Sequence, residues 1–118
     1  MNHKDLDVWN RSITLVKNVY LCTSNFPVSE RFGLMMQMRR AAISIISNIA
    51  DGAARDSDKE LIQFLYHSLG SAAELETQII VARELEFISD IADIDARIQQ
   101  VKQLLIGLIR YLQSMPRN

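Results

Sequence analysis

Apolar residues recur every three or four positions through most of this chain, which is the spacing of one face of an α-helix. No segment alternates apolar and polar residues with the period of two that a half-buried strand shows. The pattern predicts four helices, over about residues 7–24, 30–50, 57–86 and 90–115. Because the connections between them are short, we predict an all-α, antiparallel up-down-up-down four-helix bundle that forms one domain over residues 1–118.

Three of these helices have an apolar seam along which residues alternate steps of three and four. In the first helix, the seam comprises Leu6, Trp9, Ile13, Val16 and Tyr20. In the third helix, it comprises Leu61, Leu65, Ser68, Ala72, Leu75, Ile79 and Ala82. In the fourth helix, it comprises Ile94, Ile98, Val101, Leu105, Leu108 and Leu112. We expect these three seams to face the core of the bundle.

Turn and capping residues mark the predicted ends of the helices. Pro27 disfavours a helical conformation in the residue before it, so it ends the first helix. Ser29 is the predicted N-cap of the second helix, and Gly52 lies where a C-terminal glycine would end it, unless the helix continues for another turn. Ser57 and Glu60 have the spacing of a capping box, which predicts the start of the third helix.

The apolar surface of the predicted helices exceeds what a single four-helix bundle needs. The fourth helix has a second apolar strip beside its seam, and the third helix has one too. In the third helix this strip comprises Ile62, Leu69, Ala73 and Ile80. We expect part of this surface to be buried between the subunits of a homo-oligomer, the alternative being a monomer with a large core.

Polar residues form a stripe on the second helix and another on the third, each at steps of four, three and four. The two stripes comprise Ser44, Asn48, Asp51 and Arg55, and His67, Ser71, Glu74 and Gln78. Two facing stripes can satisfy each other's hydrogen bonds and fix the register of the two helices. We therefore interpret six of these residues as a structural polar seam: Ser44, Asn48, Asp51, Ser71, Glu74 and Gln78. The alternative is an acid–base site built from Asp51, Glu74 and His67.

Other features of the sequence argue against catalysis and metal binding. Neither His3 nor His67 has a glutamate three residues before it, so the motif of carboxylate di-metal bundles is missing. The sequence also lacks a glycine-rich phosphate loop, a nucleophile elbow and a zinc-protease motif. We therefore predict a protein that is not an enzyme and that has no metal site and no cofactor.

Composition and charge bear on location and partners. A single cysteine is compatible with a reducing compartment, and no apolar run approaches the length of a membrane span, so we expect a cytoplasmic protein without membrane contact. The net charge of −1 provides no overall attraction to nucleic acid, so such binding would need a local patch. The candidate phosphate contacts are Arg39, Arg40, Arg55 and Lys59, although charges on a helix are often merely solvated.

Five segments in order along the chain carry a resemblance to a known family. They are Leu6–Trp9 (LDVW), Phe26–Glu30 (FPVSE), Gln37–Ser44 (QMRRAAIS), Asn48–Gly52 (NIADG) and Gly70–Gln78 (GSAAELETQ). With these motifs the chain resembles the small four-helix-bundle proteins encoded in intervening sequences of bacterial 23S rRNA genes, a family that includes accessory variability determinant proteins of diversity-generating retroelements. The chain departs from the family pattern at Ile46, where proline is common, and at Asp51, where glutamate is usual.

The resemblance implies a bundle that assembles as a homo-oligomeric ring, specifically a homopentamer, without catalytic activity. It also implies a link to rRNA or another structured nucleic acid, with a reverse transcriptase or a ribosome-associated protein as a further partner. Our functional hypothesis is a non-enzymatic oligomer that binds structured RNA or a nucleoprotein through repeated basic patches. The alternative is a protein-binding scaffold or adaptor that makes no direct contact with nucleic acid.

Overall fold

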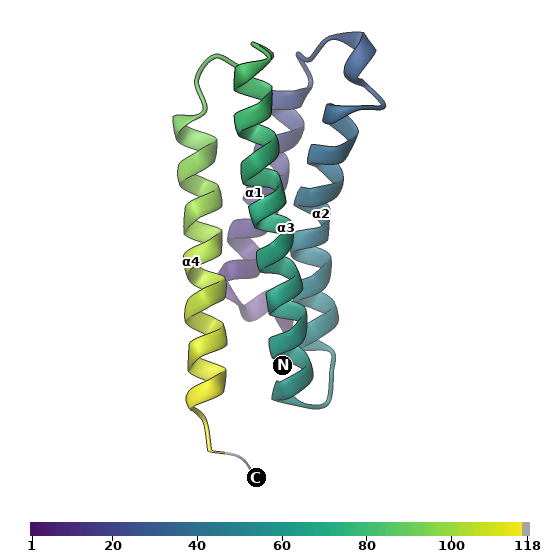
Figure 1. Cartoon of the computed structure of the whole chain (residues 1–118). Coiled ribbons are helices and arrows are strands. Elements are labelled where there is room, and N and C mark those ends of the chain that lie inside the picture. The colour runs from purple at the N-terminus through teal and green to yellow at the C-terminus, as the bar shows by residue number, and fades with distance from the viewer. Residues whose placement is uncertain (117–118) are drawn as a thin grey trace.

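The computed structural model describes residues 1–116 and contains four α-helices, which confirms the all-α class (Figure 1). This part of the chain contains no β-strand. Two short 3₁₀ helices, η1 and η2, precede the first and second α-helices. The elements in chain order are η1 (His3–Asp5), α1 (Asp7–Thr23), η2 (Val28–Glu30), α2 (Leu34–Ala53), α3 (Asp58–Glu84) and α4 (Ala92–Ser114).

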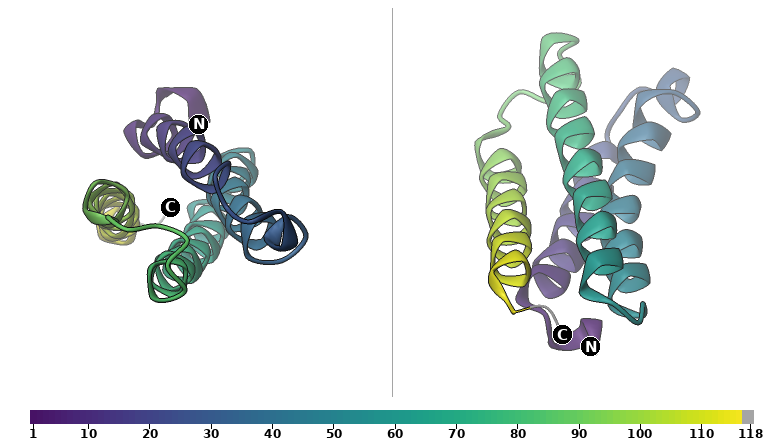
Figure 2. Two further views of the ribbon diagram at one scale, coloured as in Figure 1. Left: turned by 90° about the horizontal axis from the view of Figure 1, so that it is seen from above. Right: turned by 60° about the horizontal axis from the view of Figure 1, so that its bottom comes forward.

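The four α-helices lie side by side along the long axis of the molecule, which measures 52 × 23 × 19 Å. Successive helices are connected at alternate ends of this axis (Figure 1). Viewed along the axis, the helices occupy the four corners of a bundle (Figure 2), and the most extensive contact is between α2 and α3. The apolar core therefore lies between all four helices. Within residues 1–116, no helix is both long and apolar enough to cross a membrane.

The predicted seams of α3 and α4 face this core. All seven seam residues of α3 are buried, which confirms that prediction. Five of the six seam residues of α4 are buried as well. The exception is Leu108, which is half-buried, and Ile109 takes its place in the core. Regular apolar repeats with steps of three and four were therefore a reliable guide to the buried faces of these two helices.

The predicted seam of α1 was wrong. The helix turns a different face toward the core, and this face includes polar residues. Its buried residues are Val8, Ser12, Leu15, Val19 and Thr23. The hydroxyls of Ser12 and Thr23 each donate a hydrogen bond of 2.7 Å to the backbone oxygen of the residue four positions earlier. A side chain that satisfies its hydroxyl in this way can be buried at little cost. Residues of the predicted seam such as Trp9 and Val16 pack half-buried at the edge of the core.

The predicted start of the second helix was also wrong, because α2 begins at Leu34 and its N-cap is Gly33. Residues 28–30 instead form η2, and Ser29 is exposed. The carboxylate of Glu30 accepts a hydrogen bond of 3.2 Å from the backbone N–H of Leu34. Glu30 therefore satisfies one of the free N–H groups at the start of α2, which is the task that the sequence suggested for Ser29.

Two phenylalanines anchor the connection between α1 and α2. Phe26 is buried, and its ring packs against Phe87 with 5.4 Å between the ring centroids. Phe87 follows the end of α3, where its N–H donates to the backbone oxygen of Ala82 and Glu86 adopts a positive φ of 64°. This is the geometry of a Schellman cap. The connection from α1 to α2 is thus held against the end of α3.

Candidate functional site

The polar residues of α2 and α3 meet at one place in the contact between the two helices. The hydroxyls of Ser44 and Ser71 form a hydrogen bond of 2.9 Å across the contact. The amide of Asn48 donates to the backbone oxygen of Ser44 at 2.9 Å and to its hydroxyl at 3.1 Å. The three side chains therefore form one hydrogen-bonded group that ties the register of α2 to that of α3.

Gln78 and Glu74 extend the polar residues along α3. Gln78 is only 7% exposed, and its amide nitrogen donates to the carboxylate of Glu74 at 3.2 Å. Its carbonyl oxygen is buried and accepts no hydrogen bond from the residues that the structure describes. A further hydrogen bond crosses the contact between α2 and α3, where the buried hydroxyl of Ser68 donates to the backbone oxygen of Ile45 at 2.8 Å. The sequence had assigned Ser68 to the apolar seam.

The acidic and basic members of the two stripes lie on the surface. Asp51, Arg55, His67 and Glu74 are all exposed. Arg55 places its guanidinium over the ring of Phe64 at 4.6 Å, and no ion pair joins it to Asp51 within residues 1–116. In the same part of the chain, no three His, Cys, Asp or Glu side chains gather as metal ligands. The structure does not bring the three residues of the alternative acid–base site into one described pocket.

The four predicted phosphate contacts fall into two separate places. Arg39 and Arg40 lie in the first half of α2, whereas Arg55 and Lys59 flank the connection between α2 and α3. At 1.5 Å per residue, about 20 Å of helix separates Arg40 from Arg55. The candidate residues therefore do not form one continuous patch on a single chain.

Arg39 and Arg40 are neighbours in sequence but have different surroundings. Arg39 is half-buried and donates hydrogen bonds to the hydroxyl of Thr23 at 2.9 Å and to the backbone oxygen of Tyr20 at 3.2 Å. Its guanidinium also lies over the ring of Tyr20, at 4.4 Å from the centroid. Arg40 is exposed and forms no hydrogen bond or ion pair with any residue that the structure describes. Arg39 is therefore tied to α1, and Arg40 is available to a ligand.

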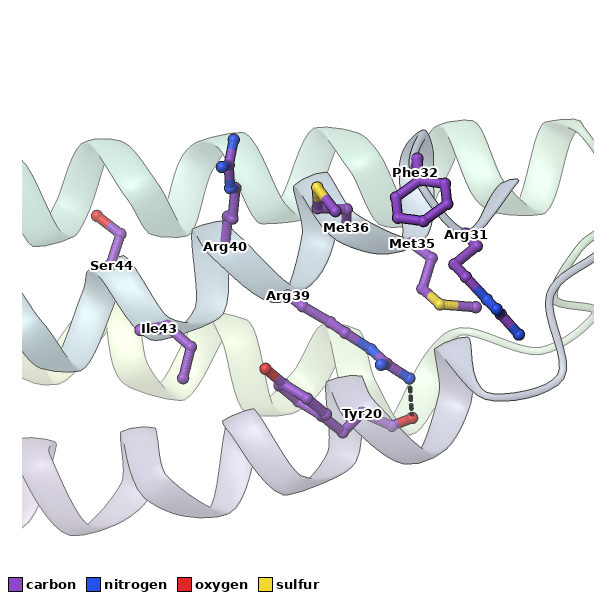
Figure 3. A pocket seen from close by; sticks show the side chains of 9 residues that line it. All are labelled: Tyr20, Arg31, Phe32, Met35, Met36, Arg39, Arg40, Ile43 and Ser44. Atoms are coloured by element: carbon purple, nitrogen blue, oxygen red, sulfur yellow. Dashed lines mark hydrogen bonds between the residues drawn. The ribbon is translucent and has the colours of Figure 1, made fainter. Parts of the chain in front are cut away.

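A groove of about 510 Å³ opens beside these two arginines, along α2 and the end of α1 (Figure 3). Most of its lining is apolar, and the lining residues are Tyr20, Arg31, Phe32, Met35, Met36, Arg39, Arg40, Ile43 and Ser44. They include three arginines and no acidic residue. Since the whole chain has a net charge of −1, the groove is locally positive on a nearly neutral molecule.

Sequence reasoning found Arg39 and Arg40 but missed the other residues of the groove. Phe32 is 80% exposed, and Arg31 beside it is exposed as well. Phe32, Met36 and Arg40 are spaced by four, so they share one face of the helix that the sequence predicted over residues 30–50. The stronger pattern of core residues in α2 concealed this second alignment.

Comparisons with known proteins agree with the fold. A family model described as 23S rRNA-intervening sequence protein matches residues 4–107. A crystal structure of a protein of unknown function from the S23 ribosomal protein family of Bacteroides thetaiotaomicron superposes with a TM-score of 0.81. The two sequences are 22% identical, and the alignment covers 93% of this chain and 99% of that chain. A comparison with curated proteins gives no match.

Proposed function

Because the chain belongs to the 23S rRNA-intervening sequence protein family, we propose that it is a non-enzymatic, antiparallel up-down-up-down bundle that assembles as a homo-oligomeric ring and binds structured RNA. The groove beside α2 is the binding surface in this proposal. The observation that carries it is the set of three arginines, with no acidic residue, in the lining of the groove. Arginine suits this task because its planar guanidinium can donate two hydrogen bonds to one phosphate.

Arg40 is the principal phosphate contact that we propose. It is exposed and has no partner among residues 1–116, so binding a phosphate would break no existing interaction. Arg39 supplies fixed positive charge at the base of the groove, since its hydrogen bonds to α1 hold it in place. Arg55 and Lys59 form a second, weaker cationic site at the other end of α2. A ring would repeat both sites, so that several weak contacts act together.

The outer face of α3 supports the assembly. Tyr66, Ala73 and Ile80 are exposed and spaced by seven residues, so they lie on one line along the helix. Two residues of the predicted apolar strip, Ile62 and Leu69, pack half-buried against the core, and therefore the surplus surface is smaller than the sequence suggested. We assign the contact between subunits to this line, and the resemblance to the family suggests five copies.

Fluorescence anisotropy with a labelled hairpin RNA, repeated over a series of salt concentrations, tests RNA binding. We expect affinity to fall linearly with the logarithm of the salt concentration, as counterions are displaced from the phosphates. Arg40→Ala should weaken binding and reduce the salt slope by about one for each phosphate that the variant no longer neutralises. Arg110→Ala is the matched control, because Arg110 is an exposed arginine on α4 away from the groove. Equal reductions of affinity in the two variants would contradict the assignment to the groove.

Analytical ultracentrifugation tests the assembly independently of RNA. Ile80→Glu should dissociate the oligomer, because it places a charge in the proposed apolar contact. Val28→Glu is the control, since Val28 is similarly apolar and exposed but lies on η2, away from the outer line of α3. A wild-type chain that sediments as a monomer would contradict the ring.

A protein-binding scaffold without RNA contact is the second candidate function. The exposed apolar lining of the groove, from Phe32 to Ile43, favours it, because exposed patches of this kind often bind proteins. In this case the partner would be a reverse transcriptase or a ribosome-associated protein. An absence of RNA binding even at low salt, together with intact assembly, would favour the scaffold over the RNA-binding protein.

A further inference from the structure

The exposure of Phe32 at the mouth of the groove is unusual for so large an apolar side chain. Its ring is 80% exposed, although the turn that carries it is well anchored. The N–H of Gly33 donates to the backbone oxygen of Glu30 at 3.0 Å, and the Glu30 carboxylate accepts from Leu34 at 3.2 Å. These bonds fix the backbone that carries the exposed side chain, which lowers the entropy that a ligand must overcome when it binds.

The groove continues from Phe32 over a flexible apolar floor. Met35, Met36 and Ile43 supply this floor, and Met36 lies between Phe32 and Arg40 (Figure 3). Methionine side chains adapt their shape to what they bind, and their sulfur atoms make favourable contacts with aromatic rings. The floor is thus suited to the flat face of a heteroaromatic ring.

Cations lie on both sides of Phe32. Arg31 lies beside Phe32 at one end of the groove, and Arg40 lies on the other side of Phe32, beyond Met36 (Figure 3). Glu30, the carboxylate nearest in sequence, is engaged with the start of α2. An anionic ligand that passes over Phe32 would therefore meet a guanidinium before and after the ring.

We propose that the groove binds unpaired nucleotides of an RNA, with one base stacked on Phe32 and the adjoining phosphates bound by Arg31 and Arg40. The inference rests on the proposed RNA-binding function and specifies the part of the RNA that the groove takes. In a duplex, the base faces are stacked inside the helix, so only phosphates and groove edges are accessible. A duplex would leave Phe32 and the methionine floor without a partner, whereas an unpaired base covers both.

The charge of the groove favours RNA over a protein segment as its occupant. Its three arginines and its lack of acidic residues match a ligand with a negative charge at every residue, which a nucleic acid has and a peptide seldom has. The combination of an exposed aromatic ring with flanking cations is also typical of surfaces that bind single strands.

Two RNAs distinguish the inference from simple phosphate binding. One is a hairpin with an unpaired loop, and the other is a blunt-ended duplex with the same number of phosphates. We expect the wild-type oligomer to bind the hairpin about tenfold more tightly in a competition measured by anisotropy, because each stacked base adds a corresponding increment of affinity. Phe32→Leu should remove this preference, whereas Phe32→Tyr, which keeps an aromatic face, should retain it. Val28→Ala is the control for removal of an exposed apolar side chain outside the groove.

The results separate failure of this inference from failure of the proposed function. Equal affinity for the two RNAs, unchanged in Phe32→Leu, would overturn base stacking and leave RNA binding through arginines intact. An absence of binding to both RNAs would overturn the inference and the RNA-binding function together. If Phe32→Leu dissociates the oligomer in sedimentation, Phe32 lies in a contact between subunits, and the inference is overturned in favour of a protein occupant.

Discussion

The two sides of α2 are built in opposite ways. Toward α3, small and polar residues allow a close approach, and Ser44 bonds directly to Ser71. Toward α1, Arg39 donates a hydrogen bond to Thr23, while Met35 and Ile43 line an open groove. Ser44 and Asn48 of the polar stripe therefore serve helix packing, and the less regular side of the same helix carries the groove that we propose as the binding surface.

Gly52 provides the most severe test of the closed side of α2, by which we mean the side that packs closely against α3. A Cβ atom added there would lie 2.7 Å from Cβ of Phe64 and 3.0 Å from Cδ1 of Leu61. Because the Cβ atom of Phe64 is bonded to the backbone and cannot move away without shifting α3, we expect Gly52→Ala to lower the free energy of unfolding by about 1–3 kcal/mol. Urea denaturation followed by circular dichroism measures this change.

Gly107 on α4 is the matched control, because no atom lies within 4 Å of the corresponding Cβ position. Gly107→Ala should raise the free energy of unfolding by up to about 1 kcal/mol, since alanine favours a helix more than glycine does. If Gly52→Ala stabilised the protein as well, α2 and α3 would not approach as closely as the comparison requires.

The neighbouring residues Arg39 and Arg40 test the side of α2 that faces α1, because Arg39 is bonded to α1 and Arg40 is not bonded to any described residue. Arg39→Ala removes the hydrogen bonds to Thr23 and Tyr20 and the contact with the Tyr20 ring, so we expect the free energy of unfolding to fall by about 1–2 kcal/mol. Arg40→Ala should change the same quantity by less than about 0.5 kcal/mol, because Arg40 has no partner among the described residues. Thermal denaturation of both variants measures these two changes. An equal destabilisation would contradict the view that Arg39 holds α2 to α1 and that Arg40 does not.

The sequence predicted the buried faces of α3 and α4 because their seams are almost wholly apolar. It failed for α1, where Ser12 and Thr23 are buried through bonds to their own helix, since residue type alone does not show that a hydroxyl is satisfied locally. It also placed the start of the second helix too early, because Ser29 is a common N-cap, whereas Glu30 and Gly33 determine the turn. In each case, a hydrogen bond that depends on local geometry outweighed the pattern.

The candidate site was only partly predictable for a related reason. Arg39 and Arg40 stand out in sequence as adjacent cations, but the sequence cannot show that one is bound to α1 and the other is not. Phe32 looked like an ordinary apolar residue in the first turn of the predicted second helix. Its exposure depends on the turn at Gly33, and the groove combines residues of this turn with residues of α2 and Tyr20 of α1.

A double-mutant cycle at Ser44 and Ser71 measures how strongly the closed side is tied together. Ser44→Ala and Ser71→Ala each leave one hydroxyl without its partner across the contact. The coupling energy from the two single variants and the double variant should be about 0.5–1 kcal/mol, which is typical of a neutral hydrogen bond. Ser114→Ala with Ser71→Ala serves as an uncoupled control, since Ser114 bonds only within its own helix. A coupling energy of zero would make the polar contact incidental to the register of α2 and α3.

The contact between α3 and α4 differs from the serine contact between α2 and α3, because Glu76 makes it sensitive to pH. Hydrogen bonds from Gln99 and then from Lys102 hold the pKa of Glu76 below its usual value of 4.5. A carboxyl whose pKa is lower in the folded state stabilises the fold above the pKa of the unfolded chain, and this contribution is lost as the pH falls through the folded pKa. Part of the stability should therefore disappear below about pH 4.5, whereas the serine bond between α2 and α3 should not titrate.

Glu76→Gln should reduce this acid destabilisation by about 0.5 kcal/mol, the size expected for a partly exposed ion pair. Urea denaturation at neutral and acidic pH measures this effect. Glu84→Gln is the control, because Glu84 is more exposed and, within residues 1–116, pairs only with its neighbour Arg83. The same pH dependence in both variants would show that the acid sensitivity comes from the overall charge and not from the contact between α3 and α4.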